Sequence, residues 1–168
     1  FNGKIHAQDY TGGLIGIGGN ISTNNITVEG NINGKENVGG LIGISIVEDD
    51  SSYIKSSYVK ANINGAKNIG GIVGYVFNKA DGPQLKNIKN EKLNAIIANT
   101  KSQRFNDDEY FNIYKSSYEG NLKGIDYVGG LIGYSTLSNL SMVNVYSSGN
   151  LDSSLNIGRF IGCLDSYN

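Results

Sequence analysis

Side chains that could perform chemistry are few in this sequence, and they lie far apart. The only histidine is His6 and the only cysteine is Cys163, near opposite ends of the 168-residue chain. A catalytic thiol needs a nearby base, and zinc sites and serine-type triads need histidines, so this pair predicts none of these sites. We expect His6 to be exposed just after a strand position and Cys163 to be a small buried apolar residue.

Acidic residues offer the next possibility, because paired carboxylates can act as general acid and base or bind calcium. The two clusters, Asp49–Asp50 and Asp107–Glu109, fall in polar stretches that we expect to be loops. Solvation of loop tips explains them better than a polysaccharide-cleaving site or a calcium site does. The sequence therefore predicts no catalytic residue, no cofactor site and no metal site, and hence a protein that is not an enzyme.

Glycine-rich loops can cradle phosphates, and this chain has 24 glycines. The run Gly16–Gly18 begins a dinucleotide fingerprint, but Ile21 stands where the third glycine belongs. The pairs Gly3-Lys4 and Gly34-Lys35 continue with Ile and Glu, which excludes a P-loop. The glycines therefore need a structural explanation.

Composition narrows the class of protein. Apolar residues make up 39%, and the net charge of −1 gives no reason to expect nucleic acid or an anionic membrane as partner. No apolar run approaches the roughly 18 residues of a membrane-spanning helix, so we expect no membrane insertion. The chain opens at Phe1 without an initiator Met. We therefore expect a segment of a larger protein, with neighbouring domains in the same parent chain.

One motif recurs along the chain. We call it the glycine box: two glycines, two aliphatic residues and a third glycine, in copies that begin at Gly12, Gly39, Gly70, Gly129 and Gly158. In the last copy Arg159 replaces the second glycine and Phe160 the first aliphatic residue. An aliphatic residue stands seven positions before each box, namely Ile5, Ile32, Ile63, Leu122 and Leu151. Two elements held in register five times indicate a repeat array.

The boxes follow one another at intervals of 27, 31, 59 and 29 residues. The third interval is close to two periods, so residues 78–109 are either an inserted loop or a decayed copy of the repeat. The run Leu93–Ala98 fits a box in which Asn and Ala replace glycines. The sequence leaves these two alternatives open.

Each repeat has the pattern of short strands. Apolar side chains alternate before the box, as at Ile26, Val28 and Ile32, and period two indicates strand rather than helix. Turn signals such as Asn33-Gly34 and Asn64-Gly65 follow. We predict an all-β fold: a parallel β-solenoid (a β-helix), right-handed, of about five to six coils, with a loop insertion near 78–109 and residues 1–168 as a single domain.

Stacking of equivalent residues explains the glycines. Successive coils of a solenoid lie about 4.8 Å apart, so a corner that must bend sharply or take positive φ favours Gly in every coil. Glycine also allows close approach of sheet layers. Asparagines at one coil position (Asn31, Asn62, Asn121 and Asn150) are expected to form amide ladders. Arg159 fits a terminal coil that caps an open edge.

Tyrosine is the most suggestive residue type for binding. Nine of the eleven tyrosines are candidates for an exposed face that binds a glycan or a protein, although cross-strand packing is the favoured explanation. These are Tyr53, Tyr58, Tyr110, Tyr114, Tyr118, Tyr127, Tyr134, Tyr146 and Tyr167.

The box, its preceding Gly-Asn-Ile element and following runs such as Ser56–Tyr58 and Tyr146–Ser148 resemble the GLUG motif. That motif occurs in exported bacterial surface proteins, including filamentous adhesins and non-catalytic regions of immunoglobulin-A-cleaving metalloproteases. The resemblance implies an extracellular or cell-surface repeat module, structural or adhesive, with a host protein or glycan as partner. An accessory domain of a secreted protease and a polysaccharide-active β-helix enzyme are the alternatives.

Overall fold

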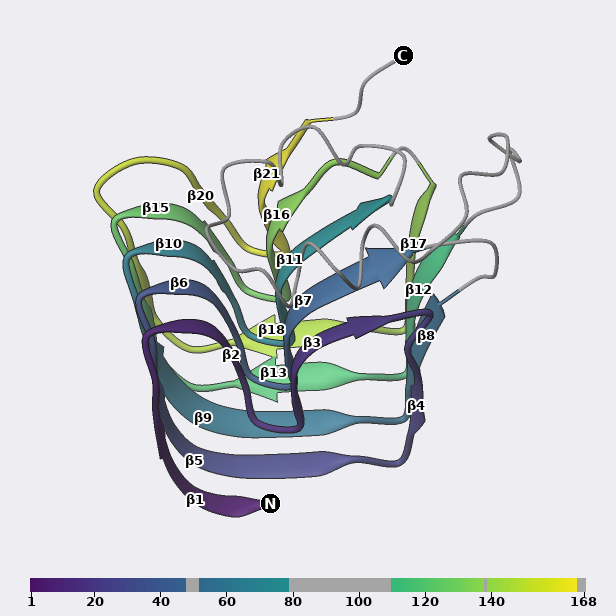
Figure 1. Cartoon of the computed structure of the whole chain (residues 1–168), viewed down its shortest axis with the longest axis horizontal. Coiled ribbons are helices and arrows are strands. Elements are labelled where there is room, and N and C mark those ends of the chain that lie inside the picture. Colours follow the sequence, from purple (N-terminus) through teal and green to yellow (C-terminus); the bar gives the residue numbers. More distant parts are fainter. Residues whose placement is uncertain (48–51, 79–109, 138, 166–168) are drawn as a thin grey trace.

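The computed structural model of the chain describes residues 1–47, 52–78, 110–137 and 139–165. In these residues the chain forms 21 strands, and no helix is present that could cross a membrane. The strands build four parallel sheets, A to D, which are the walls of one continuous stack (Figure 1). The predicted all-β parallel β-solenoid is therefore confirmed, whereas its right-handedness stays a prediction.

Sheet A crosses the lower part of the stack in Figure 1 and receives strands from every repeat. Its residues pair in register from coil to coil, so that Ile5 lies beside Ile32, Ile32 beside Ile63, and Ile63 beside Leu122. The aliphatic residue before each box thus occupies one column. The strands are β1 (Asn2–His6), β5 (Thr27–Asn33), β9 (Tyr58–Asn64), β13 (Ser117–Glu119), β14 (Leu122–Lys123), β18 (Tyr146–Ser148) and β19 (Leu151–Asp152).

Sheets B and C carry the two halves of the glycine box. The first glycine of every box ends a strand of sheet B, and these glycines pair from coil to coil. Sheet B contains β2 (Asp9–Gly12), β6 (Glu36–Gly39), β10 (Lys67–Gly70), β15 (Asp126–Gly129) and β20 (Ile157–Gly158). Sheet C contains β3 (Ile15–Gly19), β7 (Ile42–Val47), β11 (Val73–Asn78), β16 (Ile132–Ser135) and β21 (Ile161–Leu164).

Sheet D closes each turn before the chain returns to sheet A. Its strands are β4 (Ser22–Asn24), β8 (Ser52–Lys55), β12 (Phe111–Tyr114) and β17 (Leu140–Val143). In the described residues the fifth repeat contributes to sheets A, B and C but not to D. The described residues therefore form about four complete turns, slightly fewer than the predicted five to six, because those of the fifth repeat contribute to sheets A, B and C alone.

Residues 79–109, including Leu93–Ala98, lie outside the described residues, but the strands on either side fix where the segment enters the coil. Strand β10 pairs directly with β15, with Gly70 opposite Gly129. Strands β11 and β12 belong to sheets C and D of the same third turn. The segment is thus inserted into the third turn, and the third and fourth coils are direct neighbours.

Close backbone approach explains the glycines of the box. A Cβ on Gly39 would overlap the carbonyl oxygen of Ile42, and a Cβ on Gly74 would lie 2.6 Å from the backbone nitrogen of Val38 in sheet B. Strands of sheets B and C therefore touch backbone to backbone, which no side chain would allow.

Positive φ was one of two predicted reasons for a glycine corner at the box, and that reason is wrong because no box glycine has positive φ. Positive φ occurs at other positions of the coil. One of them is the corner where sheet D turns into sheet A, as at Ser56 (49°) and Lys115 (48°). Asn25 and Asn144 take the same conformation at the same corner of other coils. Asparagine tolerates this left-handed region better than most residues, and Ser56 and Lys115 show that the corner does not require glycine.

The interior is filled by stacked apolar columns from all four sheets. In sheet C, Ile42, Val73 and Ile132 are fully buried one above another. In sheet A the column changes from Val59 to Tyr118, which is also fully buried. Dispersion and apolar burial along these columns hold the coils in register.

Candidate functional site

The outer face of sheet A presents polar side chains in straight columns. The side-chain amide of Asn62 donates to Asn31 Oδ1 at 3.2 Å, and that of Asn121 donates to Asn62 Oδ1 at 2.9 Å. The predicted amide ladder is thus confirmed across three coils. At the next rung, the carbonyl oxygen of Asn150 accepts a main-chain hydrogen bond from the amide of Leu122. Such ladders hold exposed side chains in fixed directions, which prepares a surface for binding.

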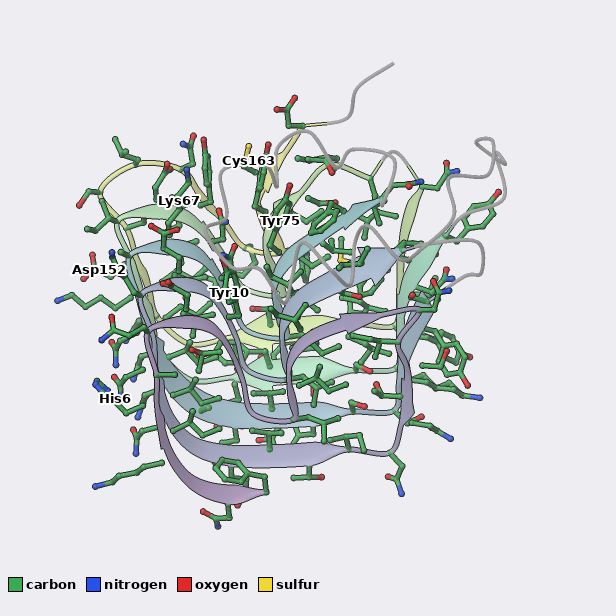
Figure 2. The ribbon with its side chains drawn as sticks, in the orientation of Figure 1. His6, Tyr10, Lys67, Tyr75, Asp152 and Cys163 are labelled. Atoms are coloured by element: carbon green, nitrogen blue, oxygen red, sulfur yellow. The ribbon has the colours of Figure 1, made fainter. Side chains whose placement is uncertain are left out.

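A second polar column runs beside the first. It contains His6, Asn33, Asn64, Lys123 and Asp152. Asn64 Nδ2 donates to Asn33 Oδ1 at 3.0 Å, and Lys123 Nζ lies 3.8 Å from Asp152 Oδ2. His6 is exposed at the end of β1 and projects from the side of the stack (Figure 2).

A hollow of ≈ 340 Å³ opens on this face where the strands of sheet A bend. Two glycines with positive φ, Gly30 (133°) and Gly120 (147°), lie in its wall. A Cβ at either position would overlap the carbonyl oxygen of the preceding coil. The hollow is lined by Glu29, Gly30, Lys60, Ala61, Asn62, Glu119 and Gly120.

Charged and phenolic groups are coupled at this hollow across neighbouring coils. Tyr58 Oη donates a 2.6 Å hydrogen bond to Glu119 Oε2, and Lys60 Nζ lies 3.7 Å from Glu119 Oε1. The hydrogen bond from Tyr58, followed by the charge of Lys60, lowers the pKa of Glu119. The same hydrogen bond is the largest cause that raises the pKa of Tyr58 to about 12.

This arrangement suits hydrogen bonding to a polar ligand. Ionised Glu119 accepts hydrogen bonds, while Lys60 and Asn62 can donate them, and a sugar hydroxyl can serve as either partner. Because its pKa is lowered, the carboxyl of Glu119 does not hold the proton that a general acid must deliver at neutral pH. The geometry favours binding over proton transfer.

Cys163 does not join this hollow. Cys163 is partly buried on β21, and its pKa is raised by burial and then by Asp165, so thiolate formation is disfavoured. Figure 2 shows it at the end of the stack opposite His6. Asp49–Asp50 and Asp107–Glu109 lie outside the described residues. Within the described ranges no group of three His, Cys, Asp or Glu side chains could hold a metal ion.

The tyrosines divide between packing and exposure. Tyr118 is buried, and its hydroxyl donates to the Ala61 carbonyl at 2.8 Å, which is a packing role. Tyr53, Tyr110 and Tyr146 are exposed. Tyr53 is on β8 of sheet D, whereas Tyr146 is the first residue of β18 in sheet A. The exposed rings therefore do not form one platform. Tyr167 lies outside the described residues.

A separate aromatic cluster lies between sheets B and C. Tyr127 stacks on Tyr134, and Tyr134 on Tyr75, each with ring centroids 5.0 Å apart. Lys67 Nζ lies 5.3 Å from the centroid of the Tyr127 ring, and Tyr134 Oη donates to Asp165 Oδ2 at 3.2 Å. Burial is the largest cause that raises the pKa of Tyr134. Because Tyr75 is only 7% exposed, this cluster chiefly packs the two sheets together.

Sequence reasoning missed the charged residues of the hollow. Glu29, Lys60 and Glu119 are isolated charges in the sequence, and only stacking brings them together. They share one register column, and a search for charged residues at equivalent repeat positions could have found them.

Comparison of the chain with protein-family models, with curated proteins and with solved structures gave no match in any of the three.

Proposed function

We propose that this chain is a non-catalytic structural and adhesive repeat module of an exported bacterial surface protein, and that the outer face of sheet A binds a glycan. The observation that carries the proposal is the hollow around Glu119. There a charged acceptor, a charged donor and an amide are held side by side by neighbouring coils. Prearranged polar groups of this kind lose little side-chain freedom on binding.

The GLUG resemblance supports a cell-surface location and neighbouring domains in the same parent chain. Physical features agree with that setting. A stack of parallel coils makes a rigid rod whose length grows with each repeat, which is useful for holding a binding face away from a surface. The net charge of −1 also gives no attraction to nucleic acid.

Binding to immobilised glycan and serum-protein arrays tests this function. We expect the wild-type chain to bind at least one glycan, and the Lys60→Ala variant to bind it roughly tenfold more weakly, because a charge-assisted hydrogen bond is lost. Lys123→Ala is the matched control, since it removes the other exposed lysine–carboxylate pair on the same face but lies outside the hollow. Binding of a serum protein without any glycan would favour a host-protein adhesin or an accessory domain of a secreted protease.

A polysaccharide-active β-helix enzyme is the second candidate. Glu29 and Glu119 lie on either side of Lys60 in one column, so their backbones are two rungs apart, roughly 9–10 Å. Inverting glycosidases hold their two carboxyl groups roughly 6.5–9.5 Å apart, a span that side chains on rungs two apart can adopt. Release of reducing sugar from a polysaccharide panel, abolished by Glu29→Gln, would establish this activity in place of simple binding.

A further inference from the structure

The second glycine of each box determines whether another coil can follow. A Cβ on Gly40 would overlap the carbonyl oxygen of Gly71, the equivalent residue of the following coil. The same overlap links Gly13 to Gly40, and Gly71 to Gly130. Each of these positions therefore faces the next coil with no room for any side chain.

The following coil also presses a side chain against the same position. A Cβ on Gly40 would meet Val59, and one on Gly71 would meet the Tyr118 ring, in each case from sheet A of the following coil. Main chain and side chain together exclude every residue except glycine at this point inside the stack. A coil with another residue there cannot be followed in the same register.

Arg159 is the exception, and it lies in the last coil of the described stack. Its carbonyl oxygen meets the Cβ position of Gly130, as each second glycine does for the coil before it. By the same backbone geometry, the Cβ of Arg159 projects into the place that a further coil would occupy. Its guanidinium also folds over the end, where Nη1 donates to the Gly149 carbonyl oxygen at 3.0 Å.

Apart from Arg159, the two ends of the stack are suited to each other. The column of first aliphatic box residues is fully buried at Leu41, Ile72 and Leu131. The same column is 48% exposed at Leu14 in the first coil and 43% exposed at Phe160 in the last. The first coil of a second copy would continue this column across the junction and cover both side chains.

We propose that Arg159 prevents end-to-end association of this solenoid: it blocks pairing between the C-terminal end of one copy and the N-terminal end of another. A second copy placed in register would bring its Gly13 carbonyl against the Arg159 Cβ, as Gly40 meets the Cβ position of Gly13 within one chain. The block is steric and resides in the first carbon of the side chain. A substitution that removes the charge of Arg159 but keeps its Cβ therefore leaves the steric block in place.

Sedimentation velocity on three chains tests this proposal. The wild type and Arg159→Ala should sediment as 18.0 kDa monomers at all concentrations, because both retain a Cβ. Arg159→Gly should associate, so that its weight-average mass at least doubles as concentration rises. Arg159→Gly combined with Leu14→Lys, which places a charge on the accepting end, should return to the monomer.

Each arm can overturn the proposal. An Arg159→Gly chain that keeps the wild-type circular dichroism spectrum but stays monomeric contradicts it, as does association of Arg159→Ala to the same extent as Arg159→Gly. A wild-type mass that increases with concentration, and that Leu14→Lys returns to the monomer, also contradicts the proposal, because the end is then open in spite of Arg159.

Discussion

Tyr58 and Glu119 are joined by a 2.6 Å hydrogen bond, although 61 positions separate them in the chain. The bond links the third and fourth coils across the outer face of sheet A and directs the Glu119 carboxylate toward Lys60. The candidate binding hollow therefore depends on the stacking of coils, and the hydrogen bond from Tyr58 is the largest cause that lowers the pKa of Glu119.

Replacement of Tyr58 by Phe should raise the pKa of Glu119, because the largest cause that lowers it is lost while Lys60 remains. The folded-state pKa of Glu119 lies below its unfolded value, so this carboxylate adds stability above the unfolded pKa and the contribution is lost as pH falls through the folded value. Tyr58→Phe should therefore lose less stability than the wild type between neutral and acid pH. Carbon-detected NMR titration of the Glu119 carboxyl measures the shift directly, with Tyr146→Phe, an exposed tyrosine of the same column, as control.

The phenol of Tyr58 should lose its proton at a higher pH than an ordinary tyrosine. Its pKa of about 12 is raised above the ordinary value of 10.0, so the stability that it contributes is present below pH 10 and is lost as pH rises through about 12. Alkaline unfolding of the wild type should therefore include a component that Tyr58→Phe lacks. Identical alkaline unfolding curves for the two chains would contradict the role assigned to this hydrogen bond.

Gly71→Ala should be strongly destabilising. The new Cβ would overlap the Gly130 carbonyl oxygen and lie against the Tyr118 ring. An overlap with backbone inside the stack cannot be relieved by the movement of a side chain. We expect a loss of about 3 kcal/mol or more in the free energy of unfolding, measured by urea denaturation. Gly3→Ala is the control, because its Cβ would meet only the Phe1 side chain at 3.3 Å. A loss below about 1 kcal/mol for Gly71→Ala would show that the coils are not packed as described.

Tyr118→Phe isolates one buried hydrogen bond. The substitution keeps the ring in the core but leaves the Ala61 carbonyl without its 2.8 Å phenolic donor. The expected loss in unfolding free energy is about 1–2 kcal/mol, whereas Tyr118→Ala should lose about 3–5 kcal/mol through the cavity that it creates. Thermal or urea unfolding of both variants gives the comparison, and equal losses would indicate that the ring contributes no packing.

The asparagine ladder predicts graded effects. Asn62 participates in two side-chain hydrogen bonds, to Asn31 and Asn121, while Asn64 donates one to Asn33. Asn62→Ala should therefore reduce the free energy of unfolding by about 1 kcal/mol, and Asn64→Ala by about half as much, because exposed hydrogen bonds contribute little each. Reversal of this order in urea titrations would show that the ladder does not stabilise the stack.

The repeat architecture could be predicted because its signal is local and recurrent. The constant seven-residue distance from Ile32 to Gly39, repeated in every copy, placed both residues in columns that the structure contains. The Asn31–Asn62 ladder followed from the same register. Backbone torsions were harder to predict, since Ser56 adopts a positive φ that no residue preference would suggest.

Alignment of the repeats can place Glu29, Lys60 and Glu119 in one column, but it cannot show that Lys60 and Glu119 are neighbours, because that depends on which coils are adjacent. The partners of Glu119 change if residues 78–109 form a coil between the third and fourth turns, and the sequence left that alternative open. Direct pairing of Lys60 with Glu119 requires an insertion instead. The predicted number of turns was too high because each box marks the start of a turn. In the residues that the structure describes, the turn that holds the last box is not complete.

NMR mapping of a bound glycan is the most direct test of whether the outer face of sheet A binds glycans. Amide signals of the nitrogen-15-labelled chain are followed as the strongest glycan from the array is added. The shifted signals should cluster at Gly30, Lys60, Asn62 and Gly120, which line the hollow on sheet A. Shifts confined to sheets B and C, or an array on which no glycan binds, would contradict glycan binding at this face.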